Sequence, residues 1–358
     1  MTALNVPSAT STHARHLTKN QQWATLIVSV LVSGGIFGVL AAGGATASFN
    51  LVGAIFVAAV LYVTLIVTLS RIVEGKRKAA DRLATGLVIT AFLIALLPLI
   101  SLLWTALQNG LPRFDLDFFN KSMRNVVGRG GGGQHAIIGT LEVTLMATLL
   151  SVPVGIMTAI YLVEYGRGRL ANAITFLIDV MTGIPSIVAG LFAYAFFAII
   201  FGPAIMFGFG GSVALSILMI PIVVRSTEEM LKLVPNELRE AAYALGVPKW
   251  LTIVKVVLPT AIAGIITGVM IAISRIIGET APLIIISGIA AGVNYNLFDG
   301  PMTTLPVFVY NQFASQGTIA QPYIDRAWTG ALTLVLIVMA MNIIARILSK
   351  VLAPKGSR

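Results

Sequence analysis

The feature that most constrains this chain is a series of apolar runs, each about 20 residues long. A helix needs roughly 20 apolar residues to cross about 30 Å of hydrocarbon. Hydrophobic residues make up 57% of the 358 residues and charged residues 11%, with a mean hydropathy of +0.93. We therefore predict an all-α integral membrane protein. The predicted spans are eight: 23–42, 49–70, 83–106, 136–163, 170–201, 212–232, 259–290 and 327–349.

Basic residues gather between alternate spans. If the N-terminus lies in the cytoplasm, 18 of the 24 lysines and arginines fall in cytoplasmic segments. Cytoplasmic loops of membrane proteins carry such an excess, so we expect both termini in the cytoplasm. The polar start of the chain has no small-residue cleavage site after the following apolar run, which predicts a retained tail at 1–22. A second tail is expected at 351–358.

The net charge of +10 does not indicate nucleic-acid binding, because no basic run is interleaved with aromatic residues. The chain has no cysteine, which excludes thiolate chemistry and cysteine zinc sites. His13, His16 and His135 are scattered over a tail and a loop, so no metal site is predicted.

Two long segments are expected on the outer side of the membrane. The first, 107–135, contains "RGGGGQH", but no Gly-Lys-Ser/Thr follows and no strand precedes it, which argues against a phosphate cradle. We expect a flexible external linker there. The second, 291–326, is rich in Asn, Gly, Pro and aromatic residues and predicts a structured cap or a short interfacial helix.

The cytoplasmic segment 228–258 predicts two short helices joined by a glycine turn. Pro235 and Asn236 favour a helix start, and Gly246 can end that helix in the left-handed conformation. The second helix is expected from Pro248 to about Val257. Helices this short are not stable alone in water. The pair must therefore dock, either on its own bundle or in a groove of a partner protein.

Spaced residues of this segment resemble the EAA loop of the permeases of ABC importers. The residues that match are Glu240, Ala241, Ala242, Gly246, Leu258 and Pro259, and Val256 stands where the pattern has Ile. The resemblance implies that the loop docks on a nucleotide-binding subunit and passes its movements to the membrane helices. The chain has no Walker A motif, so we expect no enzymatic activity and no cofactor in it, with ATP and Mg bound by partner ATPase subunits.

Three further stretches resemble the permease subunits of high-affinity phosphate importers. They are "GIPSIVAGLF" (183–192), "RSTEEMLKLVPNELREAAYALGVPKWLTIVKVVLP" (225–259) and "SRIIGETAPL" (274–283). The resemblance implies a six-helix type I permease core at 83–350 in the bacterial plasma membrane. It also implies a second permease subunit, two ATPase subunits and an external phosphate-binding protein. Residues 23–82 lie outside that core as two additional helices and a basic loop, for which we expect a stabilising or subunit-packing role.

Two charges interrupt the apolar stretch "MIAISRIIGETAPLIIISG" at 270–288. A charge at the bilayer centre costs about 2.5–3.5 kcal/mol on translocon scales, so Arg275 and Glu279 should face the bundle interior. In a continuous helix their spacing of four places them on one face, together with the small residues Ala272 and Gly268. One interpretation is an ion pair that only orients helices.

The other interpretation is an anion path. Arg225, near the cytoplasmic end of the sixth span, can point into the same cavity as Arg275. Two guanidinium groups suit a tetrahedral oxyanion, because each offers paired N–H donors and keeps its charge in a dry site. Our hypothesis is that Arg225 and Arg275 line the phosphate path, and that Glu279 pairs with Arg275 when phosphate is absent and limits how tightly the anion is held. Asp179 and Glu142 are assigned no role.

A helix break is predicted in the fifth span at Gly183 and Pro185, between Thr182 and Ser186. Proline removes one helical hydrogen bond and obstructs another. Irregular backbone at membrane depth is tolerated only against protein or a cavity. Both a packing kink and a gate in the pathway fit this break.

Other functions fit parts of the pattern. The cargo could be another anion or small solute, because selectivity would rest largely on the external binding protein. In an ion-driven secondary carrier, the charge pair would act as a relay, and no partner-docking loop would be needed at 237–259. A membrane-embedded enzyme would need a nucleophile with a base or a metal cluster, which the few ionisable residues do not form.

Overall fold

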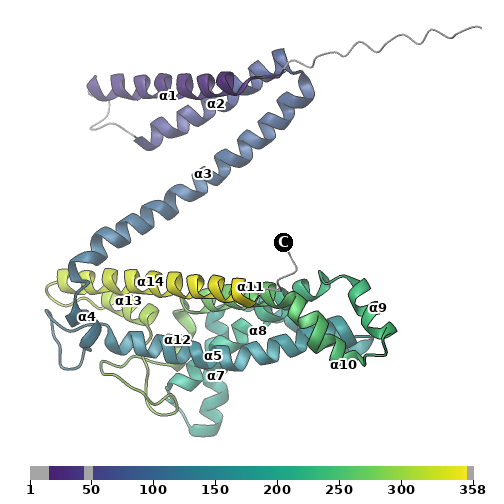
Figure 1. Ribbon diagram of the computed structural model, residues 1–358. Helices are drawn as coiled ribbons and strands as arrows, with labels where there is room; N and C mark the ends of the chain where they lie inside the picture. The colour runs from purple at the N-terminus through teal and green to yellow at the C-terminus, as the bar shows by residue number, and fades with distance from the viewer. Residues whose placement is uncertain (1–15, 44–50, 353–358) are drawn as a thin grey trace, which may run out of the picture. The chain divides into compact units, whose positions relative to one another are not determined.

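The regular structure of this chain is helical throughout the part that the computed structural model describes, residues 16–43 and 51–352 (Figure 1). The predicted tails lie largely outside these residues. The chain divides into two units, one ending at Leu103 and the other beginning at Trp104. The helices are α1 (Lys19–Ala42), α2 (Leu51–Val73), α3 (Lys76–Gly110), η1 (Leu111–Arg113), α4 (Leu116–Asn120), α5 (Gln134–Ile160), η2 (Tyr161–Tyr165), α6 (Arg169–Thr182), α7 (Ser186–Phe201), α8 (Gly208–Lys232), α9 (Asn236–Ala244), α10 (Lys249–Thr252), η3 (Ile253–Val257), α11 (Leu258–Ile276), α12 (Ala281–Ile286), α13 (Leu305–Ala314) and α14 (Gln321–Leu352).

Seven of the described helical segments are long and apolar enough to cross a membrane, and the bent pair α6 and α7 makes an eighth candidate. The predicted all-α fold with about eight spans is confirmed. The prediction of one continuous span over 259–290 is wrong, because α11 ends at Ile276 and α12 begins at Ala281. Pro282 explains the break, since proline has no N–H to donate and its ring obstructs the carbonyl four residues earlier.

Helix α8 is the centre of the second unit and packs against α5, α6, α7 and α11. In its most apolar window, 61% of the residues are buried. Its first half is rich in buried glycine, serine and alanine, small residues that let neighbouring membrane helices approach closely. The side chains of Ser212 and Ser216 donate hydrogen bonds to the carbonyls of Val143 and Ala147 on α5, at 3.1 and 3.3 Å.

The facing surface of α5 is a stripe of buried residues spaced by four: Gly139, Val143, Ala147, Ser151 and Gly155. A Cβ on Gly155 would lie 2.6 Å from the Val223 side chain of α8, closer than any normal contact. On the other side of α8, a Cβ on Gly268 of α11 would lie 2.5 Å from Ser226 Oγ. The small residues therefore determine the spacing of the three central helices.

The segment between α4 and α5 is tied to the rest of its unit. The guanidinium of Arg326 is 1% exposed and donates hydrogen bonds to the carbonyls of Gly128 and Gly130, at 2.7 and 2.9 Å. Arg113 donates another to Gly131 at 2.7 Å. The expectation of a flexible linker is therefore wrong, because the carbonyls of the glycine-rich backbone accept hydrogen bonds from Arg326 and Arg113. In the other long segment, α13 confirms the predicted short helix.

In the first unit, the carboxylate of Glu74 joins the turn between α2 and α3 to the start of α1. It accepts hydrogen bonds from Arg82 at 2.8 and 3.1 Å, from Ser70 Oγ at 2.7 Å and from Leu17 N–H at 2.9 Å. The hydrogen bond from Arg82 is the main reason why the pKa of Glu74 falls to about 2, so this carboxylate is charged at physiological pH.

Candidate functional site

The segment after α8 forms two short helices that project at one end of the second unit, at the end opposite α4 (Figure 1). Helix α9 is followed by Gly246 with φ of +77°, the left-handed conformation that the sequence predicts. Helix α10 then continues through the π-helical turn η3 into α11, and these three segments form one apolar stretch, Lys249–Ile276. Any displacement of α10 therefore acts directly on α11.

The residues that match the EAA pattern lie on this projection and in the first turn of α11. Glu240 and Ala241 are exposed, whereas Ala242 is buried and holds α9 against the bundle. Leu258 is partly buried, and the exposed Pro259 lies in the first turn of α11. Next to Gly246, the Leu245 side chain is 84% exposed. Other large apolar side chains exposed on the same projection and its flanks are Leu233, Leu238, Tyr243, Trp250 and Val254.

Arg239 fastens the inner face of α9 to two other elements. It donates two hydrogen bonds to Glu164 Oε1 of η2, at 2.8 and 3.0 Å, and others to the carbonyls of Leu231 and Val234, at 3.0 and 2.6 Å. Carbonyls at the end of a helix have no partner within the helix, so Arg239 satisfies the C-terminal end of α8. Arg239 and Glu164 side chains are only 12% and 5% exposed.

A second cation reaches the same turn from α10. The ammonium of Lys249 donates to the backbone carbonyl of Glu164 and lies 4.6 Å from the centre of the Tyr165 ring. The projection is thus tied at both of its helices to η2, the π-helical end of α5. The interpretation of segment 228–258 as a loop that docks on its own bundle is correct for its inner face, and its outer face is not covered by any described residue of this chain.

We predict that Arg239→Ala loosens α9 by leaving Glu164 buried without its charge partner. Breaking a buried ion pair in this way costs about 3–5 kcal/mol. Amide hydrogen exchange in α9 should become at least about 100-fold faster, as measured by mass spectrometry. Arg167→Ala is the matched control, because Arg167 is exposed and forms no ion pair among the described residues. Unchanged amide hydrogen exchange in Arg239→Ala would contradict the proposed role of Arg239 in holding α9 against η2 and α8.

Arg225 lies on α8 seven residues before its end and is surrounded by acidic groups. It forms an ion pair with Asp179 of α6 and another with Glu228 at 3.0 Å. Glu228 also accepts a hydrogen bond from Lys232 at 2.6 Å. The Arg225 side chain is 37% exposed, so its guanidinium is both paired and accessible within this chain. Asp179, to which the sequence assigns no role, is therefore a direct ion-pair partner of Arg225.

Arg275 and Glu279 do not have the arrangement that a continuous helix predicts. Arg275 is exposed near the end of α11, while Glu279 lies in the break before α12. No ion pair joins the two within the described part of the chain. Gly268 and Ala272 are buried in the bundle, whereas Arg275 and Ile271 are exposed. The expected pairing and shared helix face are wrong because the helix ends before Glu279.

The two arginines lie at different depths. Since Gly268 faces Ser226, Arg275 is seven residues further along α11 from the level of Arg225, which corresponds to about 10 Å at 1.5 Å per residue. An anion that moves along this face would meet them one after the other. A single bidentate clamp made of both guanidiniums is not formed within this chain.

The two helix breaks lie next to each other. At Gly183 and Pro185 the chain bends by 110° between α6 and α7, more than a kink in one span. Helix α7 then packs on α12, where a Cβ on Gly190 would lie 2.5 Å from Pro282 Cα. A hollow of about 780 Å³ beside this contact is lined by α7, α12, α13 and α14, without a charged residue. At the first break, however, Thr182, Gly183 and Pro185 are exposed, so no described part of the chain covers this irregular backbone.

Sequence comparisons identify the kind of protein to which these elements belong. Residues 151–358 match the family described as "Binding-protein-dependent transport system inner membrane component". The match covers more than half of the chain, so the chain belongs to this family of multi-pass inner-membrane permease components.

Two relatives are similar over most of their length. A phosphate transport system permease protein PstA of Mycobacterium leprae is 43% identical over 278 residues, which cover 76% of this chain and 90% of the relative. A protein of the same name from Pasteurella multocida is 40% identical over 274 residues, covering 76% of this chain and 95% of the relative. The additional length of this chain corresponds to about one quarter of its residues.

Proposed function

We propose that this chain is the transmembrane permease subunit of an ATP-driven importer of inorganic phosphate. The observation that carries the proposal is an exposed projection with the EAA residues in a chain about 40% identical to PstA proteins. The permease core is proposed at 83–350, with both termini in the cytoplasm. The partners are a PstC-like second permease, two PstB-like ATPase subunits that bind ATP and Mg, and a PstS-like external phosphate-binding protein.

Coupling to ATP hydrolysis runs through the projection. The exposed Leu245, Glu240 and Ala241 offer a small apolar and charged surface to a groove of the ATPase subunit. When that groove moves, Arg239 pulls on the end of α8, and η3 moves α11. These two helices carry Arg225 and Arg275. The same contacts therefore connect the surface that binds the ATPase subunit to the two arginines that we propose line the phosphate path.

In this proposal, phosphate moves along the path by binding to Arg275 and then by competing with the carboxylates that pair with Arg225. Phosphate reaches Arg275 first from the outside, because Arg275 lies about 10 Å further from the cytoplasmic end of the bundle than Arg225. Among the described residues, Arg275 has no carboxylate partner that phosphate must displace. At Arg225, phosphate must compete with Asp179 and Glu228, which limits how tightly the anion is held. Weak binding at the inner end favours release into the cytoplasm. In this scheme Asp179 and Glu228 replace Glu279 as the groups that oppose tight binding.

The decisive experiment is the ATPase rate of the complete complex in lipid nanodiscs, with and without its phosphate-loaded binding protein. We expect phosphate-loaded binding protein to stimulate ATP hydrolysis severalfold, and the unloaded protein to stimulate it less. Stimulation by the binding protein of another solute, with no response to phosphate, would contradict the cargo but not the class. Uptake that survives ATP depletion and follows an ion gradient would contradict both the phosphate cargo and the class of ATP-driven importer.

A further inference from the structure

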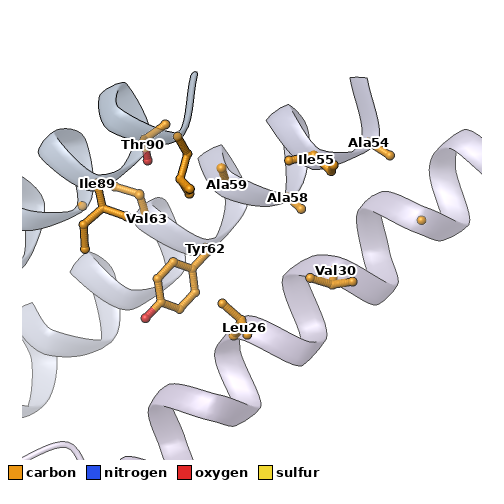
Figure 2. A pocket seen from close by; sticks show the side chains of 13 residues that line it. Leu26, Val30, Ala54, Ile55, Ala58, Ala59, Tyr62, Val63, Ile89 and Thr90 are labelled. Atoms are coloured by element: carbon orange, nitrogen blue, oxygen red, sulfur yellow. The ribbon is translucent and has the colours of Figure 1, made fainter. Parts of the chain in front are cut away.

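The two helices that precede the permease core, together with α3, enclose an apolar groove of about 380 Å³ (Figure 2). Leu26 and Val30 line it from α1, Ala58 and Val63 from α2, and Ile89 from α3. Of its lining residues, only Tyr62 and Thr90 carry a side-chain hydroxyl. The volume is within the range of about 300–1,000 Å³ typical of ligand sites.

A polar hollow of about 500 Å³ continues this groove. Tyr62, Gly86 and Ile89 line both, so the two hollows adjoin. The polar hollow is lined further by His16, Lys78, Asp81 and Arg82. The combined site is therefore amphipathic, with an apolar part inside the spans and a charged part at their end.

The apolar part has the length of a lipid chain within one leaflet. It follows α1 from Leu26 to Gly34, eight residues, which correspond to about 12 Å. Half of the hydrocarbon thickness is about 15 Å. In Figure 2, Tyr62 projects beside Leu26. Tyr62 lies at the middle of α2, so the apolar part begins near the middle of that span and the polar hollow leads from there to the end of the span.

The charged part favours an anionic headgroup. Glu74 is 1% exposed and its oxygens are already occupied by Arg82, Ser70 and the Leu17 N–H. Lys78, whose ammonium contacts the exposed His16 ring, has further donors for a phosphate oxygen. The segment from Arg71 to Arg82 carries five basic and two acidic residues. Such a cluster directly beside membrane helices attracts anionic lipids.

We propose that the 16–103 unit binds one anionic phospholipid, with an acyl chain in the groove between α1, α2 and α3 and its phosphate at Lys78. The lipid gives the two additional helices a specific role, because it fills the space that their own side chains leave open. This site is independent of the phosphate path and of the cargo that the complex carries.

The test is lipid retention by the complete complex, measured by native mass spectrometry after washing in detergent doped with either phosphatidylglycerol or phosphatidylcholine. Wild-type complex should retain phosphatidylglycerol selectively. Gly34→Leu should abolish retention, because a Cβ on Gly34 meets no atom within 4 Å and the larger side chain fills the groove. Lys78→Gln should lower retention about fivefold, as expected for one lost lysine contact.

Each variant has a matched control. Gly35 also has open space around its Cβ but does not line the groove, so Gly35→Leu should retain lipid as the wild type does. Lys76 lines a separate hollow, so Lys76→Gln should have a smaller effect than Lys78→Gln. The proposal is overturned if the wild type retains no lipid, if it retains phosphatidylcholine equally, or if each control variant matches its test variant. None of these outcomes depends on phosphate transport.

Discussion

Replacing Arg275 with alanine is expected to lower ATP-driven phosphate uptake by about 10- to 100-fold, since a charge-assisted hydrogen bond contributes about 1.5–3 kcal/mol. Of the two arginines, Arg275 gives the result that is easier to interpret. It is exposed and has no ion pair within the described part of this chain, so its removal leaves no buried charge unpaired. Removal of Arg225, in contrast, would free Asp179 and Glu228.

The measurement is radiolabelled phosphate uptake into proteoliposomes that contain the complete complex, normalised to the amount of complex. Arg275→Lys keeps the charge but loses the planar fork that matches two phosphate oxygens, so it should recover only part of the rate. Arg346→Ala, which removes an exposed arginine of α14, is the matched control and should transport normally. Full uptake by Arg275→Ala would show that this residue does not handle the anion.

Replacing Leu245 with aspartate is expected to weaken binding of the ATPase subunits by about 30-fold, which corresponds to the roughly 2 kcal/mol typical of a central interface residue. Leu245 is 84% exposed and thus contributes little to the stability of the free chain. The substitution places a charge in the middle of the proposed contact. ATP-linked uptake should fall with the loss of association, while the abundance of the permease in the membrane stays unchanged.

Association is measured by pull-down and by size-exclusion chromatography of the purified complex. Val127→Asp is the matched control, because Val127 is 92% exposed and lies in the segment between α4 and α5, at the other end of the unit. Gly246→Asp is a second variant of the turn. Its Cβ meets open space, but its φ of +77° costs a non-glycine residue about 1–2 kcal/mol. Normal association of both Leu245→Asp and Gly246→Asp would contradict our interpretation of the projection.

Local patterns predicted much of this molecule. The apolar runs indicated the spans, because a helix must satisfy all of its backbone hydrogen bonds in lipid. Gly246 indicated a left-handed turn, and Pro185 a helix break, because each residue restricts or permits backbone angles by itself. The 110° size of the bend between α6 and α7 could not be predicted, since it depends on how α7 packs on α12.

Local sequence patterns could not predict which charged residues form ion pairs with each other. A spacing of four predicted that Arg275 pairs with Glu279, but a new helix begins at Ala281, with Pro282 in its first turn, and Glu279 falls in the break before it. Asp179 is 46 residues from Arg225, and Glu164 is 75 residues from Arg239. No periodicity within a helix indicates pairs at such separations. Arg239 and Glu164 carried no signal in the sequence beyond being ionisable residues near span ends.

The sequence by itself determined the class of protein, most of the spans and the two short helices around Gly246, because hydrophobic length, backbone conformation and a spaced motif are all properties of neighbouring residues. Only the tertiary structure decided which carboxylates face Arg225, which contacts tie α9 to α8, and which helices enclose the groove above Lys78. These features depend on the packing of helices that are far apart in the chain. The small residues on α5, α8 and α11 let those helices pack closely. This packing determines where charged side chains such as Arg225 lie.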